Sequence, residues 1–305
     1  SLTENFLKYD PAEIFHSHKV KPEDLNILMS NAGISQEESE IVKLLYTSEG
    51  TYLTHNSSYK MFYDGREAFD SIIQDLESAK ETIYMEYFIW RSDGLGEKVK
   101  DVLVKKAKEG VKIRLLFDGM GSFGTISEKY RKELAKVGVE FKYFLDIKFA
   151  LSKLNYRNHR KITIVDNRIL HTGGMNLGEE YITGGKRFES WRDTNVRIQG
   201  ELVLHYLAIF VTDWLNSGGK QDFKMSDIEE VIEEHKKVQK DSPYLMQVSS
   251  SGPDTIWTTL KYTYSKLIGL AKKEILIQSP YFIPDTSLVS QLKIAALSGV
   301  KIKLM

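Results

Sequence analysis

The stretch NHRKITIVDNRILHTGGMN, residues Asn158–Asn176, decides how the rest of the sequence is interpreted. Its β-branched residues around Ile162 and Ile164 favour an extended strand, and VDNR is typical of a tight turn before a second strand. Residues two apart on a strand share a face, so His159 and Lys161 are expected to point the same way.

The residue types in this stretch suit the binding and transfer of a phosphoryl group. Lys161 supplies a fixed positive charge, and His159 can attack phosphorus or move protons near neutral pH. Gly173 and Gly174 let the backbone approach a ligand closely, and Asn176 offers amide donors. Each has a plain structural alternative when taken singly, but their joint spacing is specific and predicts a phosphate-handling site.

Asp166 belongs to the same motif, yet its position favours a different role. It ends the first strand at the turn signal, and its odd spacing from Lys161 puts it on the other face or in the turn. We therefore include Asp166 among the catalytic motif residues but interpret it as structural more readily than as catalytic. A phosphodiester also needs a separate proton donor, which this stretch does not supply.

The sequence before this stretch alternates between strand and helix patterns. From Tyr59 to Asp118, short apolar strands alternate with helices that are apolar on one side. This order predicts an α/β fold with a mixed, largely parallel sheet flanked by helices. The first fifty residues look helical, with a start at Pro22 and a capping box from Ser35 to Glu38.

Two segments recur in the same order about 190 residues apart, which indicates an internal repeat. AKETIYMEYFIW from Ala79 matches AKKEILIQSPYFIP from Ala271, and AKEGVKIRLL from Ala107 matches ALSGVKIKLM from Ala296. We expect two pseudo-repeated halves, the second incomplete. Four aromatic residues are expected just after the repeated strands and are candidates to line the mouth of the site, with core packing as the alternative: Tyr87, Phe88, Tyr281 and Phe282.

These patterns predict three parts of the chain. Residues 1–50 form a helical accessory or linker segment, residues 51–240 the half with the motif, and residues 241–305 the start of the second half.

Composition narrows the function classes. Lys plus Arg and Asp plus Glu both number 42, so no bulk charge indicates nucleic acid, and no nucleic-acid partner is expected. The absence of cysteine excludes disulfides, thiolate catalysis and sulfur-ligated zinc. The most apolar run, from Leu202, is interrupted by His205 and Asp213 and fits a buried helix better than a membrane span.

The motif around His159 resembles the signature His-x-Lys-x4-Asp-x6-Gly-[Gly/Ser]-x-Asn of the phospholipase D superfamily at every fixed position. Over almost its whole length the chain resembles one branch, the bacterial cardiolipin synthases. MEYFIWRSDGLGEKV, WRDTNVRIQG and SPYFIPD are typical of that branch, and so is Gly174, where many superfamily members have Ser.

The resemblance implies a phosphatidyltransferase that joins two phosphatidylglycerol molecules into cardiolipin and releases glycerol. His159 would attack phosphorus to give a phosphatidyl-histidine, while Lys161 and Asn176 hold the phosphoryl oxygens. A carboxylate, here Asp193, would fix the second nitrogen of the imidazole; Glu189 is the reserve. Pairing of Asp193 with a neighbouring arginine is the structural alternative. No metal or organic cofactor is expected.

Three departures qualify the resemblance. Asn195 stands where the family has His, the paired transmembrane segments at the N-terminus are absent, and the signature occurs once. We expect the second histidine in sequence beyond this chain, with a homodimer as the fallback. The expected location is the bacterial cell membrane, with phosphatidylglycerol and the membrane surface as partners and the catalytic domain on the cytoplasmic side. A phosphodiesterase or nuclease, and an inactive lipid- or protein-binding fragment, are the alternatives.

Overall fold

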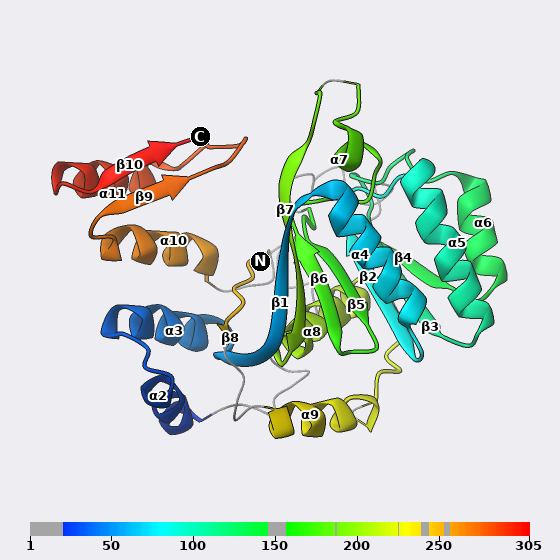
Figure 1. The fold of residues 1–305 in the computed structure, drawn as a ribbon, viewed down its shortest axis with the longest axis horizontal. Coiled ribbons are helices and arrows are strands. Elements are labelled where there is room, and N and C mark those ends of the chain that lie inside the picture. The colour runs from blue at the N-terminus through cyan, green and yellow to red at the C-terminus, as the bar shows by residue number, and fades with distance from the viewer. Residues whose placement is uncertain (1–20, 146–156, 187, 225, 239–243, 253–256) are drawn as a thin grey trace. The chain divides into compact units, whose positions relative to one another are not determined.

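The computed structural model describes residues 21–145, 157–186, 188–224, 226–238, 244–252 and 257–305, which form two compact units (Figure 1). The first unit contains the described residues from Thr54 to Met246, and the second joins those before Thr54 to those after Met246. The helices expected within residues 1–50 therefore share a unit with the C-terminal segment. The three-part division of the chain stays a prediction.

An eight-stranded sheet with the order β4-β3-β2-β5-β6-β7-β1-β8 forms the centre of the first unit. The mixed α/β fold is confirmed. Parallel pairing is confined to β2, β3 and β4, a smaller share than the sequence indicated, because β5, β6, β7, β1 and β8 all pair antiparallel. The strands are β1 (Thr54–Asp64), β2 (Thr82–Tyr87), β3 (Lys112–Asp118), β4 (Glu140–Phe144), β5 (Lys161–Val165), β6 (Ile169–Gly173), β7 (Arg192–Gly200) and β8 (Tyr244–Met246).

Helices cover both faces of this sheet (Figure 1). Strand β2 alternates between the faces: Ile83 and Met85 join the core with α4 and α5, whereas the Tyr84 ring stacks 5.1 Å from Phe210 of α8. The apolar run from Leu202 forms the buried helix that the sequence predicted. The helices are α4 (Gly65–Ser78), α5 (Gly94–Lys108), α6 (Glu128–Lys136), α7 (Glu180–Thr183), α8 (Leu202–Asn216) and α9 (Ser226–Val238).

Within its described residues, the second unit contains a two-stranded parallel sheet and four helices. Its Ile275 pairs with Ile302 as Ile83 pairs with Ile113 in the first unit, which is the register that the two sequence matches predict. The capping box from Ser35 to Glu38 is present at the start of α3. The elements are α2 (Pro22–Asn31), α3 (Gln36–Glu49), α10 (Thr259–Leu270), β9 (Glu274–Ile277), α11 (Thr286–Leu297) and β10 (Lys301–Leu304).

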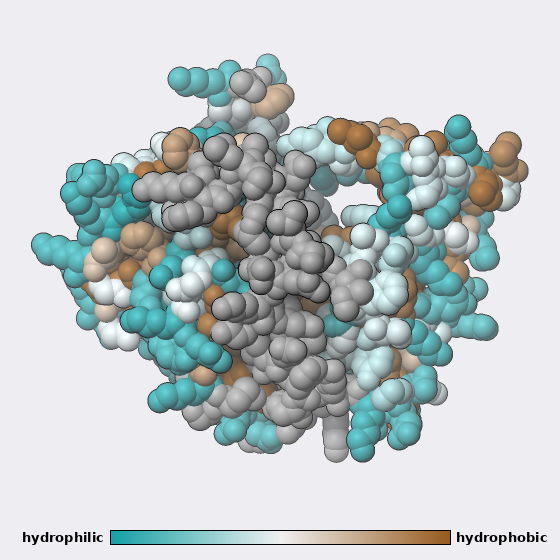
Figure 2. Space-filling model, turned by 180° about the vertical axis from the view of Figure 1, so that it is seen from behind, coloured by the Kyte–Doolittle hydropathy of each residue, from teal (hydrophilic) through white to brown (hydrophobic). Residues whose placement is uncertain are grey.

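Hydrophobic residues form small groups between hydrophilic ones on the molecular face drawn in Figure 2. None of the helices within the described residues combines the length and apolar character needed to cross a bilayer.

Candidate active site

Most predicted site residues of the first unit, with the exception of Asp166, lie on one side of the sheet, where β2 and β6 end and the antiparallel β5 and β7 begin. Tyr87 at the end of β2 pairs with Lys161 at the start of β5, and Gly173 at the end of β6 pairs with Asn195 near the start of β7. The antiparallel pairing therefore brings residues that are far apart in sequence to the same side, next to His159.

His159 lies just before β5 rather than on it, because the strand begins at Lys161. His159 is exposed as a residue, although its ring is partly buried against Phe88. Lys161 is buried, and its Nζ donates a hydrogen bond of 2.7 Å to the His159 carbonyl oxygen. The Phe88 ring packs 4.8 Å from the His159 ring and 5.6 Å from Lys161 Nζ, measured to the ring centroid. Phe88 thus contacts both groups that the sequence assigned to phosphate chemistry.

The protonation of this pair suits attack on a phosphodiester. Burial, together with the positive charge of Lys161, lowers the pKa of His159, and Asp193 opposes the shift. The imidazole is therefore neutral and able to act as a nucleophile at neutral pH. Burial lowers the pKa of Lys161 to about 8, against the attraction of Asp193 and Asp118, so this amine carries its charge below that pH.

Asp193 lies close enough for its negative charge to oppose the lowering of the pKa of both His159 and Lys161, and its Oδ1 accepts a hydrogen bond of 2.7 Å from the Thr194 N–H. A bond from Asp193 to the His159 imidazole stays a prediction. A Cβ on Gly174 would lie 2.1 Å from Asp193 Oδ1, so the carboxylate occupies space that only glycine leaves open. Arg197, one alternative partner of Asp193, instead bonds the Asp75 carboxylate at 2.6 and 3.1 Å. The carboxylate is thus packed against the glycine pair, near the histidine.

Asn176 lies buried beside this cluster with both ends of its amide engaged. Its Oδ1 accepts a hydrogen bond from the Ile89 N–H at 3.0 Å, and its Nδ2 donates to the Tyr181 hydroxyl at 2.6 Å. Nδ2 has a second hydrogen with which it can donate to a phosphoryl oxygen. Gly173 has φ of 152°, and a Cβ there would lie 2.3 Å from the Thr194 carbonyl oxygen.

Asp166 lies at the opposite end of β5 from His159. Its backbone has φ of 50° in the turn before β6, and its carboxylate accepts three backbone N–H bonds at the start of β2, from Lys80, Glu81 and Thr82, at 2.8–2.9 Å. The structure therefore does not bring Asp166 to the cluster around His159. It has the contacts expected of the structural interpretation.

The aromatic candidates differ in their surroundings. Tyr87 is only 3% exposed, belongs to the core and bonds Thr163 through its hydroxyl at 2.9 Å, whereas Phe88 contacts His159. Tyr281 and Phe282 belong to the second unit, where both side chains are exposed.

Several buried polar residues near the site were not identified as candidates from the sequence. The Asp118 carboxylate, at the end of β3, accepts bonds from the N–H groups of Met120, Gly121 and Asn158, and burial raises its pKa. Glu86 in β2 and Asp213 in α8 are each 2% exposed. A carboxylate within an otherwise apolar strand or helix was the signal available, since charged side chains are rarely buried without a partner.

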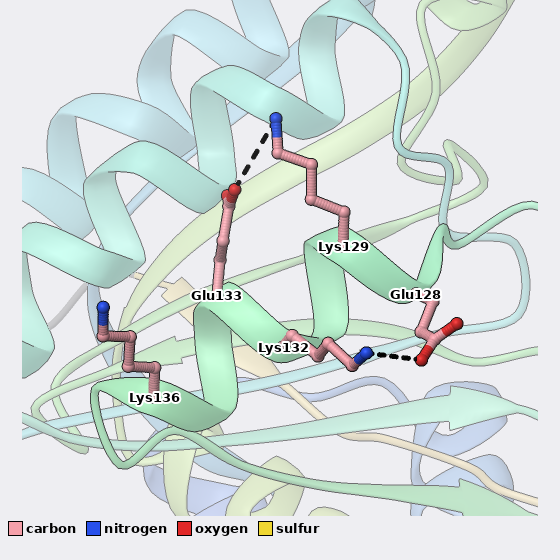
Figure 3. Close-up of a pocket in the computed structure, with 5 residues that line it drawn as sticks. All are labelled: Glu128, Lys129, Lys132, Glu133 and Lys136. Carbon is pink, nitrogen blue, oxygen red and sulfur yellow. Dashed lines mark ion pairs between the residues drawn. The ribbon is translucent and has the colours of Figure 1, made fainter.

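An open depression on α6 lies outside the group of residues just described (Figure 3). Its charges compensate one another through ion pairs between Lys132 and Glu128 at 2.7 Å and between Lys129 and Glu133 at 3.8 Å; Lys136 completes the lining. We assign no ligand to it.

Comparison with known proteins supports this interpretation of the motif. Residues 72–214 match the family model described as "Cardiolipin synthase, PLD-like domain". A cardiolipin synthase of Listeria monocytogenes serotype 4a (strain HCC23) is 39% identical over 274 residues, which cover 88% of this chain and 55% of that protein. The major cardiolipin synthase ClsA of Bacillus subtilis (strain 168) is 35% identical over 290 residues, or 94% of this chain and 59% of that protein.

The chain thus spans somewhat more than half the length of these curated relatives. A crystal structure of phosphatidylserine synthase from Haemophilus influenzae Rd KW20 has a similar fold, with a TM-score of 0.59 and 14% identity over 88% of this chain and 65% of that one. The similarity to the two cardiolipin synthases covers 88% and 94% of this chain, and the family match over residues 72–214 includes the motif from His159 to Asn176. The chain belongs to the cardiolipin synthase family of phospholipase D-like proteins.

Proposed function

We propose that this chain carries one catalytic half of a phosphatidyltransferase that makes cardiolipin from two phosphatidylglycerol molecules. The observation that carries the proposal is the accessible imidazole of His159, with a lowered pKa, beside the buried ammonium of Lys161. A neutral nitrogen and a fixed positive charge at the same place are what attack on an anionic phosphodiester requires.

In the first step, a ring nitrogen of His159 bonds to phosphorus and the bond from phosphorus to the glycerol headgroup breaks. A second histidine, from a second half or from another copy of the chain, protonates the departing glycerol. That histidine then takes the proton from a hydroxyl of the second phosphatidylglycerol, whose oxygen displaces His159 and forms cardiolipin.

Three residues assist these steps. Lys161 and Asn176 stabilise the negative charge that grows on the phosphoryl oxygens, and Asp193 orients the imidazole of His159. The substrate and product are membrane lipids, so the site works at a membrane surface. We propose the cytoplasmic side of the bacterial membrane.

The test is incubation of the protein with phosphatidylglycerol vesicles, followed by mass spectrometry of the lipids. Cardiolipin that disappears with His159→Ala and with Lys161→Ala, but persists with the surface variant Lys132→Ala on α6, would support the proposal. Release of phosphatidic acid would instead identify a hydrolase. Lack of any product, together with lack of a phosphoryl adduct on His159, would refute the proposed transfer.

A further inference from the structure

A buried polar network lies directly beneath the segment that carries His159. The Asn158 side-chain amide donates to the Glu86 carboxylate and, at 3.1 Å, to Asp213 Oδ2. Asp213 Oδ2 also accepts a bond from the Arg160 guanidinium. The network therefore joins β2, α8 and the residues on either side of His159.

This network fixes the backbone around the reacting histidine. The Asn158 N–H donates to Asp118 Oδ2 at 3.1 Å, and Asn158 Oδ1 accepts from the Arg160 N–H at 3.0 Å. With its side-chain amide bound to two carboxylates as well, Asn158 is held from four directions. The His159 carbonyl that receives Lys161 Nζ lies in the same short segment.

The charges of the network do not balance if both carboxylates are ionised. Glu86 and Asp213 are each 2% exposed, and Arg160 supplies a single positive charge. Glu86 Oε2 is buried and accepts no hydrogen bond from a donor group among the described residues. A buried charge without a partner is strongly destabilising, whereas one proton would neutralise the excess negative charge.

We propose that Glu86 and Asp213 hold one proton between them and, through Asn158 and Arg160, position the segment that carries His159. The inference rests on the proposed role of His159. Glu86 and Asp213 touch no substrate in this scheme; they are positioning residues that act through Asn158 and Arg160.

The electrostatic surroundings of Glu86 agree with this assignment. Burial, followed by the negative charge of Asp213, raises the pKa of Glu86 well above its usual value, and Arg160 and the Asn158 hydrogen bond oppose the shift. The groups that face Glu86 are Asp213 from α8 and Arg160 and Asn158 from the segment before β5. Tyr206, also on α8, is influenced by Arg160.

The held proton can be tested without any assay of activity. In the folded protein Glu86 would keep its proton, whereas in the unfolded chain it would release that proton above its ordinary pKa of 4.5. Glu86 therefore makes the free energy of unfolding fall as the pH rises above 4.5. Urea unfolding of the whole protein at several pH values should show this fall. In Glu86→Gln the slope of the free energy of unfolding against pH should correspond to one bound proton fewer than in wild type. In the exposed α6 control Glu128→Gln this slope should be unchanged.

The positioning role needs a second set of variants. Asn158→Asp adds a third carboxylate and should lower kcat about 100-fold, a loss of the size expected from misplacing a reacting group, with KM changed little. In the double variant Glu86→Gln with Asn158→Asp, the amide at position 86 can donate a hydrogen bond to the carboxylate at position 158. This variant should recover most of the lost kcat. The rate at which diethyl pyrocarbonate labels His159, measured by peptide mass spectrometry, should change and recover in parallel.

The outcomes separate this inference from the proposed function. If the free energy of unfolding depends on pH equally in wild type and Glu86→Gln, the claim that Glu86 and Asp213 hold a proton is refuted. Wild-type labelling of His159 in Asn158→Asp, or absence of recovery in the double variant, would overturn the positioning role. If the wild type makes no cardiolipin, the unfolding and labelling measurements still decide the inference on their own.

Discussion

Replacement of Asp166 by alanine should unfold the protein more readily without removing its chemistry. The carboxylate accepts three backbone N–H bonds from residues 80–82, at the start of β2. Hydrogen bonds to a charged group contribute about 1.5–3 kcal/mol each, but Asp166 is half-buried and water would replace part of them, so about 2–4 kcal/mol is expected in total. Alanine at the φ of 50° adds about 1 kcal/mol.

Asp166→Asn separates these two contributions. Asparagine tolerates the left-handed conformation, and its carbonyl can still accept from Glu81 and Thr82, which both bond Asp166 Oδ1. It should therefore cost about 1–2 kcal/mol, since one charge-assisted bond is lost and the others weaken. Asp64→Ala, which removes the N-cap of α4, is a matched control and should cost about 1 kcal/mol.

The assay is urea unfolding of all three variants, followed by transfer measured per folded molecule. Both Asp166 variants should retain a near-normal kcat at a temperature where they are folded. If the Asp166 variants have a normal free energy of unfolding but lose transfer completely, the structural interpretation is refuted and Asp166 has a catalytic role.

Four further predictions concern the site and the residues next to it. Gly174→Ala should lower kcat by about 10-fold to 100-fold, since its Cβ would lie 2.1 Å from Asp193 Oδ1 and force that carboxylate to move; a normal rate would contradict the role of Asp193. The kcat/KM of the wild type should fall as pH rises through about 8, where Lys161 loses its proton, and Lys161→Arg should move this fall to higher pH. Lys161 should also make stability rise between pH 8 and 10.5, because the unfolded chain binds that proton more tightly, so Lys161→Met should flatten the rise in unfolding experiments. Tyr87→Phe should cost about 1 kcal/mol through the lost bond to Thr163 and leave transfer unchanged; a selective loss of activity would show that Tyr87 acts at the site.

Most helices and strands were predictable from the sequence because their signals are local. The 3.6-residue period of α4, the apolar run of β2 and the capping box at Ser35 each reflect preferences of a few neighbouring residues. The predicted repeat has a structural counterpart, because β9 pairs with β10 in parallel as β2 pairs with β3. Motif spacing alone singled out His159, Lys161 and Asn176.

The direction and order of the remaining strands needed the tertiary structure. Whether β1 pairs with β7 depends on contacts between residues more than a hundred positions apart, and no local preference specifies them. For the same reason the sequence overestimated the parallel share of the sheet. The sequence also indicated both Tyr87 and Phe88 as candidates, but Tyr87 at the end of β2 enters the core, whereas the next residue, Phe88, contacts the histidine.

The sequence by itself identified the family, the candidate reacting residues and most of the elements that carry them. Only the tertiary structure decided their surroundings. Asp193 packs against Gly174. Glu86 and Asp213 bind the same Asn158 amide because α8 covers the face of the sheet opposite the α4 and α5 core. The physical reason is that secondary structure follows short-range backbone and side-chain preferences, whereas burial and charge pairing depend on which distant segments pack together.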